Sequence, residues 1–324
     1  MASNRNVYLV KGYLKGRCRG IVKLLINNFN LARKIFIDKN YAASKSEYCY
    51  DVWMKHFKYW IKLKNNVPDV VVEIGSGNSL GVGIAALLSG TSKFYALEKT
   101  KFWNNSTNLR IFDELVEMFK QQQVSKGYIK DTREMNDKNM SFPYHILNED
   151  HLNKCLSEKR LFQIRKELEH PNSPNNKFIR SIIPWIKEEH LESNSVDLIC
   201  SQSVLQHVID LDFTYKTLSL WLKKGGCISH TIDFKSMNTT KLWNQHWTLN
   251  KSEWNIITGG MNLINREPLS THLRLLEKYE FKIIYKVPVI KTNTLSVENL
   301  SDDFKHLDHN DLTTSGYYYF AQTD

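Results

Sequence analysis

Two glycines and one acidic residue have types and a spacing that suit a nucleotide-like ligand. Gly75 and Gly77 lie between the β-favouring run 70–74 and the small, apolar run 80–90, which predicts a strand, a tight turn and a helix. Glycine lets the backbone approach a ligand, and the first N–H groups of a helix attract polar groups. Glu98 follows the next predicted strand, 23 residues after Gly75, where a carboxylate can accept hydrogen bonds from a ribose. The alternatives are a glycine loop without a ligand and a solvated strand-end acid.

A second set of residues could carry protons, because histidines and one carboxylate lie at or after the predicted ends of later strands. The candidates are His207, His230, Asp233, His246 and His272. His230 and His246 rank first, since one ends a predicted strand and the other lies in a loop flanked by tryptophan. For any single histidine, a buried structural role is at least as good an explanation.

The elements that would position these residues alternate between strand and helix patterns. Strands are predicted at 70–74, 93–97, 178–185, 195–200 and 227–232, with β-rich segments at 281–290 and 317–322, and helices between them at 80–88 and 213–222. This order predicts an α/β fold with a doubly wound, mainly parallel sheet, whose ligands bind at the carboxyl ends of the strands.

The chain is predicted to contain an N-terminal basic helical segment, residues 1–66, and a ligand-binding domain, residues 67–324. Helical patterns at 7–36 and 42–64 precede the first strand. Residues 101–178 are too long for a simple crossover. Helical patterns at 109–119 and 152–168 predict that this segment is a helical insertion beside the ligand pocket.

Most of the net charge belongs to the N-terminal segment. Residues 1–39 contain nine Lys or Arg and one acid, a net charge of +8, against +10 for the whole chain. The amphipathic pattern at 7–36 favours a helix that packs on its own domain, and the alternative is contact with an anionic membrane surface, a partner or a nucleic acid. Because the remaining residues are near neutral, nucleic acid is not the favoured partner.

Composition limits the other classes of function. The five cysteines are scattered without a CxxC pair, which favours neither a disulfide framework nor a metal site. No apolar run approaches the roughly 20 residues of a membrane span, and the N-terminus lacks the features of a signal peptide. We therefore expect a cytoplasmic protein, with the inner membrane surface as the place where residues 1–36 would make any membrane contact.

The order of motifs resembles that of class I S-adenosylmethionine-dependent methyltransferases. Glu73-Ile-Gly75-Ser-Gly77 and Glu98 carry the resemblance in the first half of the domain. It is closest to a bacterial group often associated with surface-polysaccharide or other glycan pathways. The remaining matching segments are 196–199, 201–208, 222–226, 229–234, 244–247, 263–268 and 270–279. The resemblance implies a seven-stranded sheet that ends in an antiparallel hairpin.

The resemblance also implies S-adenosylmethionine as the cofactor and assigns residues to it. Glu73, Gly75, Ser76 and Gly77 would hold the methionine moiety, and Glu98 the ribose. Gln202, Ser203 and His207 would line the sulfonium side. The acid common after the third strand is missing, so Ser181 or Trp185 would take its place beside the adenine. The acceptor would be held by Asn244, Trp247, Asn265 and Arg266, with Trp243 and Trp254 as further flat faces for a sugar ring.

The predicted activity is therefore O-methylation of a sugar or glycan precursor by an S-adenosylmethionine-dependent methyltransferase. Methylation of another small molecule or of RNA is the alternative within enzymes, and a non-catalytic module that retains the fold is the alternative outside them. A dinucleotide dehydrogenase is disfavoured, because Leu80 stands where a third glycine would complete the pyrophosphate-binding motif.

Overall fold

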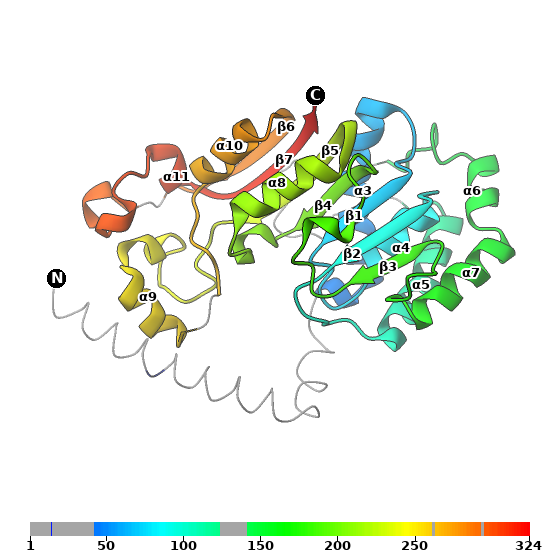
Figure 1. Cartoon of the computed structure of the whole chain (residues 1–324), viewed down its shortest axis with the longest axis horizontal. Helices are drawn as coiled ribbons and strands as arrows, with labels where there is room; N and C mark the ends of the chain where they lie inside the picture. The colour runs from blue at the N-terminus through cyan, green and yellow to red at the C-terminus, as the bar shows by residue number, and fades with distance from the viewer. Residues whose placement is uncertain (1–13, 15–41, 124–140, 261–262, 293–294) are drawn as a thin grey trace.

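The computed structural model describes residues 14, 42–123, 141–260, 263–292 and 295–324. Its centre is a seven-stranded sheet with the order β3-β2-β1-β4-β5-β7-β6 (Figure 1). The strands are β1 (Val70–Ile74), β2 (Lys93–Leu97), β3 (Ile179–Ile182), β4 (Val196–Gln202), β5 (Leu222–Asp233), β6 (Phe281–Ile290) and β7 (Thr314–Thr323). The α-helices of the described residues are α3 (Ser46–Lys64), α4 (Gly81–Leu88), α5 (Asn105–Lys120), α6 (Glu149–Cys155), α7 (Glu158–Glu169), α8 (Leu211–Trp221), α9 (Lys251–Thr258), α10 (Leu269–Lys278) and α11 (His309–Thr313).

The pairing of the strands confirms the predicted fold class. In the parallel part of the sheet, Val72 of β1 pairs with Tyr95 of β2 on one side and with Ile199 of β4 on the other. Strand β7 lies antiparallel between β5 and β6. The chain therefore has the doubly wound, mainly parallel sheet with an antiparallel pair at one edge that the resemblance implied.

Alternate residues along the strands face two hydrophobic layers, as the period of two in a strand requires. Val71 and Leu198 belong to the layer under α3, α4, α5, α6 and α7, whereas Val72 and Ile199 belong to the layer under α8 and α10. Helix α4 lies close to the sheet because Gly83 has no side chain: a Cβ there would lie 2.0 Å from the ring of Phe94 on β2. The two helical layers cover both faces of the sheet (Figure 1).

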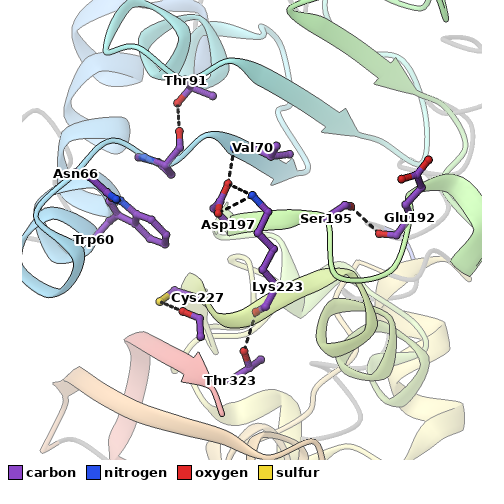
Figure 2. A network of polar contacts seen from close by, with 12 residues as sticks. Trp60, Asn66, Val70, Thr91, Glu192, Ser195, Asp197, Lys223, Cys227 and Thr323 are labelled. Carbon is purple, nitrogen blue, oxygen red and sulfur yellow. Dashed lines mark hydrogen bonds and ion pairs between the residues drawn. The ribbon is translucent and has the colours of Figure 1, made fainter. Parts of the chain in front are cut away.

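The start of β5 differs from the sequence prediction, which placed a helix end at 222–226 and a strand from residue 227. The strand begins at Leu222, which pairs with Val196, and resumes its pairing at Cys227, opposite Leu198. The register of the pair shifts over the intervening residues, and Nζ of Lys223, one of them, donates to Asp197 at 2.9 Å (Figure 2). Oδ2 of the same Asp197 accepts a hydrogen bond from the backbone of Val70, so one ion pair ties β5, β4 and β1 together at the end of the sheet opposite the predicted site.

The helical insertion at 101–178 contains α5, α6 and α7, while residues 124–140 lie outside the described part of the chain. Helix α3 confirms the helical pattern at 42–64, and its apolar face joins the same hydrophobic layer as α4. The predicted helices at 7–36 lie outside the described residues except for Leu14, so the boundary at residue 66 and the membrane contact stay predictions. Among the described helices, none has the length and apolar character needed to cross a bilayer.

Candidate functional site

A cavity of about 720 Å³ opens at the carboxyl ends of the parallel strands. Each contributing segment directly follows a strand or begins the helix after it, which is where ligands bind in doubly wound sheets. The lining residues are Ile74, Gly75 and Gly77 at the end of β1 and after it, Leu97, Glu98, Lys99, Thr100 and Phe102 at the end of β2 and after it, Trp185 and Ile186 after β3, Val204 and 207–210 after β4, and Phe213 and Thr214 on α8.

The glycine turn forms one wall of this cavity and requires glycine in two ways. Gly75 and Gly77 have φ values of +74° and +69°, a region that other residues enter only with strain. At Gly75 a Cβ would also lie 2.6 Å from the side chain of Val204, which packs against the turn and also lines the cavity. The backbone N–H of Gly75 donates to the carbonyl of Leu97 at 2.8 Å, so the turn is fixed to the end of β2. Ser76, between the two glycines, is buried.

Two buried carboxylates lie beside the turn. Oε1 of Glu98 accepts a hydrogen bond of 2.7 Å from the backbone N–H of Gly77. Burial raises the pKa of Glu98 to about 7, although hydrogen bonds from Gly77 and Ser76 act in the opposite direction. Burial and the neighbouring Glu98 carboxylate raise the pKa of Glu73 well above its usual range. Oε2 of Glu73 is buried and has no hydrogen-bond partner among the described residues, and neither Glu73 nor Ser76 is among the residues that line the cavity.

An apolar rim is formed by the segments that follow β2, β3 and β4. Three of its side chains are unusually exposed for their size: Phe102 at 46%, Ile186 at 62% and Ile209 at 67%. Exposed apolar side chains grouped around a cavity favour a ligand with a flat apolar part. Trp185 adds a further ring to this side, and its backbone N–H donates to the carbonyl of Glu98. Ser181 is buried within β3 and is not among the lining residues.

The end of β4 is held from the other face of the sheet by a buried lysine. Nζ of Lys55, on α3, donates to Oε1 of Gln202 at 2.5 Å and to Oγ1 of Thr231 at 2.6 Å. Ser203 has a φ of +54° and donates from its backbone to the carbonyl of Thr231. Gln202 and Ser203 therefore lie immediately before Val204 of the cavity wall, and neither is among the lining residues.

His207 lines the cavity and is the one member of the proton-carrying set that does so among the described residues. It ends the short 3-10 helix η4 (Leu205–His207), and its side chain is exposed. Its Nδ1 lies 2.5 Å from the carbonyl oxygen of Leu263. Because a carbonyl oxygen only accepts, this contact assigns the proton of the neutral ring to Nδ1 and leaves the lone pair on Nε2.

The other predicted histidines lie in the interior and not on the cavity wall. Burial lowers the pKa values of His230, His246 and His272 to about 3, so their rings are neutral at physiological pH. His230 contacts Oγ of Ser201 at 2.7 Å, and His272 contacts the hydroxyl of Tyr215 at 2.9 Å. The first-ranked histidines are thus not brought together with the glycine turn.

Asp233 and the predicted acceptor-binding residues also stand away from the cavity lining. Asp233 forms an ion pair with Lys235. The remaining residues bond with their side chains to backbone carbonyls: Asn244 to Leu312, Trp247 to Arg266, Arg266 to Leu249 and His246, and Asn265 to Leu205 and Val208. These bonds hold the loops between β5 and α10, and the assignment of these residues to an acceptor stays a prediction.

Several lining residues were not anticipated from the sequence. They include Lys99, Thr100, Phe102, Ile186, Val208, Ile209, Asp210, Phe213 and Thr214. Their shared signal is position, since the first few residues after each parallel strand, or the start of the helix that follows, form the rim. That rule would have selected them without any motif.

No family model and no curated protein matches the chain. Solved structures similar to it include an S-adenosylmethionine-dependent methyltransferase from Mesorhizobium loti, with 12% identity, a TM-score of 0.40 and coverage of 83% of this chain and 99% of that one. A Methanosarcina mazei methyltransferase of the same description has 12% identity and a TM-score of 0.38, over 79% and 93% of the two chains. Phosphoethanolamine N-methyltransferase 2 of Haemonchus contortus, solved with S-adenosylmethionine, has 12% identity and a TM-score of 0.41, over 84% of this chain and about half, 52%, of its own.

Proposed function

We propose that this protein is an S-adenosylmethionine-dependent methyltransferase. The observation that carries the proposal is the meeting of the Gly75–Gly77 turn with the buried Glu98 carboxylate in one cavity. This pair combines a backbone that a ligand can approach closely with an acceptor for ribose hydroxyls. The strand order, with its antiparallel edge, supports the same fold-level assignment.

The residues of the cavity fit the parts of S-adenosylmethionine. Glu98 would accept from the ribose, and the apolar rim of Phe102, Ile186 and Ile209 would cover the adenine. Gly75 and Gly77 would contact the methionine moiety, and the buried Glu73, which is not among the lining residues, would act on this part of the pocket only through the turn that follows it. When bound, this cofactor supplies a methyl group on a sulfonium sulfur. A nucleophile attacks the methyl carbon in line, and the sulfur leaves as a thioether.

The chain's own contribution to the reaction is to align the acceptor, exclude water and receive a proton. His207 is the residue proposed to receive it, because its ring lines the cavity and the carbonyl of Leu263 keeps the proton of the neutral ring on Nδ1. Nε2 is then available as a base, which suits an acceptor hydroxyl. His230, His246 and His272 are less suited, since their rings are buried away from the cavity wall and burial lowers their pKa values to about 3, which makes them weak bases.

For the acceptor we propose a sugar or glycan hydroxyl, a proposal that rests on the motif resemblance and on the base at His207. Another small molecule or RNA is the alternative, and a non-catalytic module the alternative outside enzymes. Screening transfer of a labelled methyl group to sugar nucleotides, small-molecule hydroxyls and RNA would separate the acceptors.

Calorimetric titration with S-adenosylmethionine tests the function itself. We expect saturable binding to the wild-type chain, its loss in Gly75→Arg, and weaker binding in Glu98→Ala. The exposed Glu158, at the start of α7, supplies the matched control Glu158→Ala, which should bind as the wild type does. No binding by the wild type, or binding that none of these substitutions changes, would overturn the proposal.

A further inference from the structure

The turn that carries His207 is fastened to a segment more than fifty residues later in the chain. Nδ2 of Asn265 donates to the carbonyl oxygens of Leu205 and Val208, at 2.9 and 2.8 Å. The backbone N–H of Asn265 donates to the carbonyl of Gln206 at 2.7 Å. Asn265 thus donates hydrogen bonds to the carbonyls of Leu205, Gln206 and Val208, the residues on either side of His207.

We propose that Asn265 is a positioning residue that sets the orientation and the tautomer of the His207 ring. This inference rests on the proposed function in that it gives His207 its purpose, but the geometry behind it is independent of any ligand. The carbonyl that accepts from Nδ1 of His207 belongs to Leu263, two residues before Asn265. The hydrogen bonds of Asn265 therefore fix the His207 turn relative to the Leu263 carbonyl, which accepts from the imidazole N–H of His207.

The orientation of the Asn265 carboxamide is itself determined. Its Oδ1 accepts from the backbone N–H of Glu267 at 3.0 Å, so the NH₂ group is directed to the two turn carbonyls. A carboxylate at this position would keep the acceptor and lose both donors, which would bring a negative charge next to two carbonyl oxygens.

The outer side of the segment is anchored as well. Arg266 adopts a φ of +65° and donates from Nη1 to the carbonyl of Leu249 at 2.7 Å. Its guanidinium lies 5.3 Å from the ring centre of Trp254 and 4.7 Å from that of Phe304. Asn265 therefore reaches the His207 turn from a segment that the loops beyond β5 hold through Arg266.

The test is the tautomer of His207, read by long-range ¹H–¹⁵N NMR of histidine-labelled protein, with the resonance assigned by its loss in His207→Gln. The wild type should show the Nδ1–H form as the main neutral species. Asn265→Asp should change the ratio of the two neutral tautomers by at least about threefold. The matched control is Asn255→Asp, at an exposed position on α9, and it should leave the ratio unchanged.

Two results would overturn the inference: a wild-type ring mainly in the Nε2–H form, or a folded Asn265→Asp protein with an unchanged ratio. The first result is measured on the wild type alone. It therefore still tests the proposal if the Asn265→Asp protein does not fold. Binding of S-adenosylmethionine is measured in parallel. A wild type that binds none but shows the expected tautomer change would refute the proposed function and leave the positioning role intact.

Discussion

The backbone N–H of Gly77 donates a 2.7 Å hydrogen bond to Oε1 of Glu98. This bond joins the two features of the chain that spacing alone selected, the glycine turn after β1 and the acid after β2. It also places a carboxylate with a pKa raised to about 7 at the wall of the cavity. Ligand binding at this wall should therefore depend on pH in the neutral range.

We expect the affinity for S-adenosylmethionine to rise with pH. Burial keeps a large fraction of Glu98 protonated below its pKa of about 7, and the ionised carboxylate is the stronger acceptor for ribose hydroxyls. Between about pH 6 and about pH 8 the ionised fraction rises nearly tenfold, so the dissociation constant should fall by up to about tenfold. Calorimetry at a series of pH values measures this change.

Glu98→Gln is the variant that isolates the carboxylate, because the amino group of the ligand also titrates near neutral pH. The amide keeps an acceptor oxygen and has no charge to gain. Its affinity should be lower at about pH 8 and should lose the part of the pH dependence that belongs to residue 98. Equal pH dependence in both proteins would show that Glu98 does not titrate on binding.

The glycine turn gives a second prediction, in which strain and steric contact are separated. Gly75 and Gly260 have similar φ values, +74° and +72°, but only at Gly75 would a Cβ meet a neighbour, Val204 at 2.6 Å; at Gly260 it meets no described atom within 4 Å. Gly260→Ala should cost about 1 kcal/mol of unfolding free energy. Gly75→Ala should cost about 1–3 kcal/mol more and weaken cofactor binding.

Urea denaturation of the two variants measures the difference, and Val204→Ala provides the check. The double variant Gly75→Ala/Val204→Ala removes the side chain that a Cβ at 75 would strike. It should therefore recover part of the stability lost in Gly75→Ala. If the double variant is destabilised by the sum of the two single changes, the contact with Val204 is not the cause.

The turn and Glu98 could be predicted from the sequence because their relationship is local. A strand, a glycine turn, a helix and the next parallel strand have a nearly fixed length, so spacing places Glu98 beside Gly77 without knowledge of the rest of the fold. The β-rich pattern at 281–290 predicted β6, whereas the antiparallel edge was implied by the resemblance. The register shift at the start of β5 was not predictable in this way, since Lys223 and Asp197 meet only after β5 has paired with β4.

The histidines illustrate why the acceptor side could not be ranked from the sequence. His230 lies near the end of a strand, but its side chain faces the layer covered by α8 and α10, close to Tyr319. Helix α10 begins about forty residues after His230, and no local sequence pattern predicts which face of the sheet the helix covers. The roles of Asn265 and Arg266 are likewise set by carbonyls far away in the chain. The sequence showed which side chains could do chemistry, but it did not show which way each of them points in the fold.

The buried histidines give a prediction about stability. The pKa of His230 in the fold is about 3, against an ordinary value of 6.5. A histidine with a lowered pKa contributes stability that is present above about pH 6.5 and lost as the pH falls toward 3. Well inside this range, each such ring should lower the unfolding free energy by about 1.4 kcal/mol for each pH unit by which the pH falls.

Urea denaturation at about pH 7 and about pH 5.5 tests this slope. His230→Gln should reduce the change in unfolding free energy between these two pH values by about 1.2 kcal/mol relative to the wild type, because the unfolded histidine is only partly protonated near pH 6.5. Glu98, whose pKa is raised, acts in the opposite direction, but it is present in both proteins and cancels in the comparison. The exposed His306 supplies the control His306→Gln, which should retain most of the wild-type slope. An unchanged slope in His230→Gln would contradict a neutral, buried ring.

The last prediction separates the base from the binding site. His207→Gln should bind S-adenosylmethionine within about threefold of the wild type, because the ring contributes one edge of the cavity, while transfer to a hydroxyl acceptor should fall by about 10²–10⁴-fold. His230→Gln should instead lower the stability of the protein and leave transfer intact. Its folded fraction should transfer the methyl group at nearly the wild-type rate. The measurement is turnover per folded molecule with a labelled methyl donor. Loss of transfer in His230→Gln at full folding, with activity retained in His207→Gln, would return the role of base to the interior of the sheet and require a route by which the acceptor reaches it.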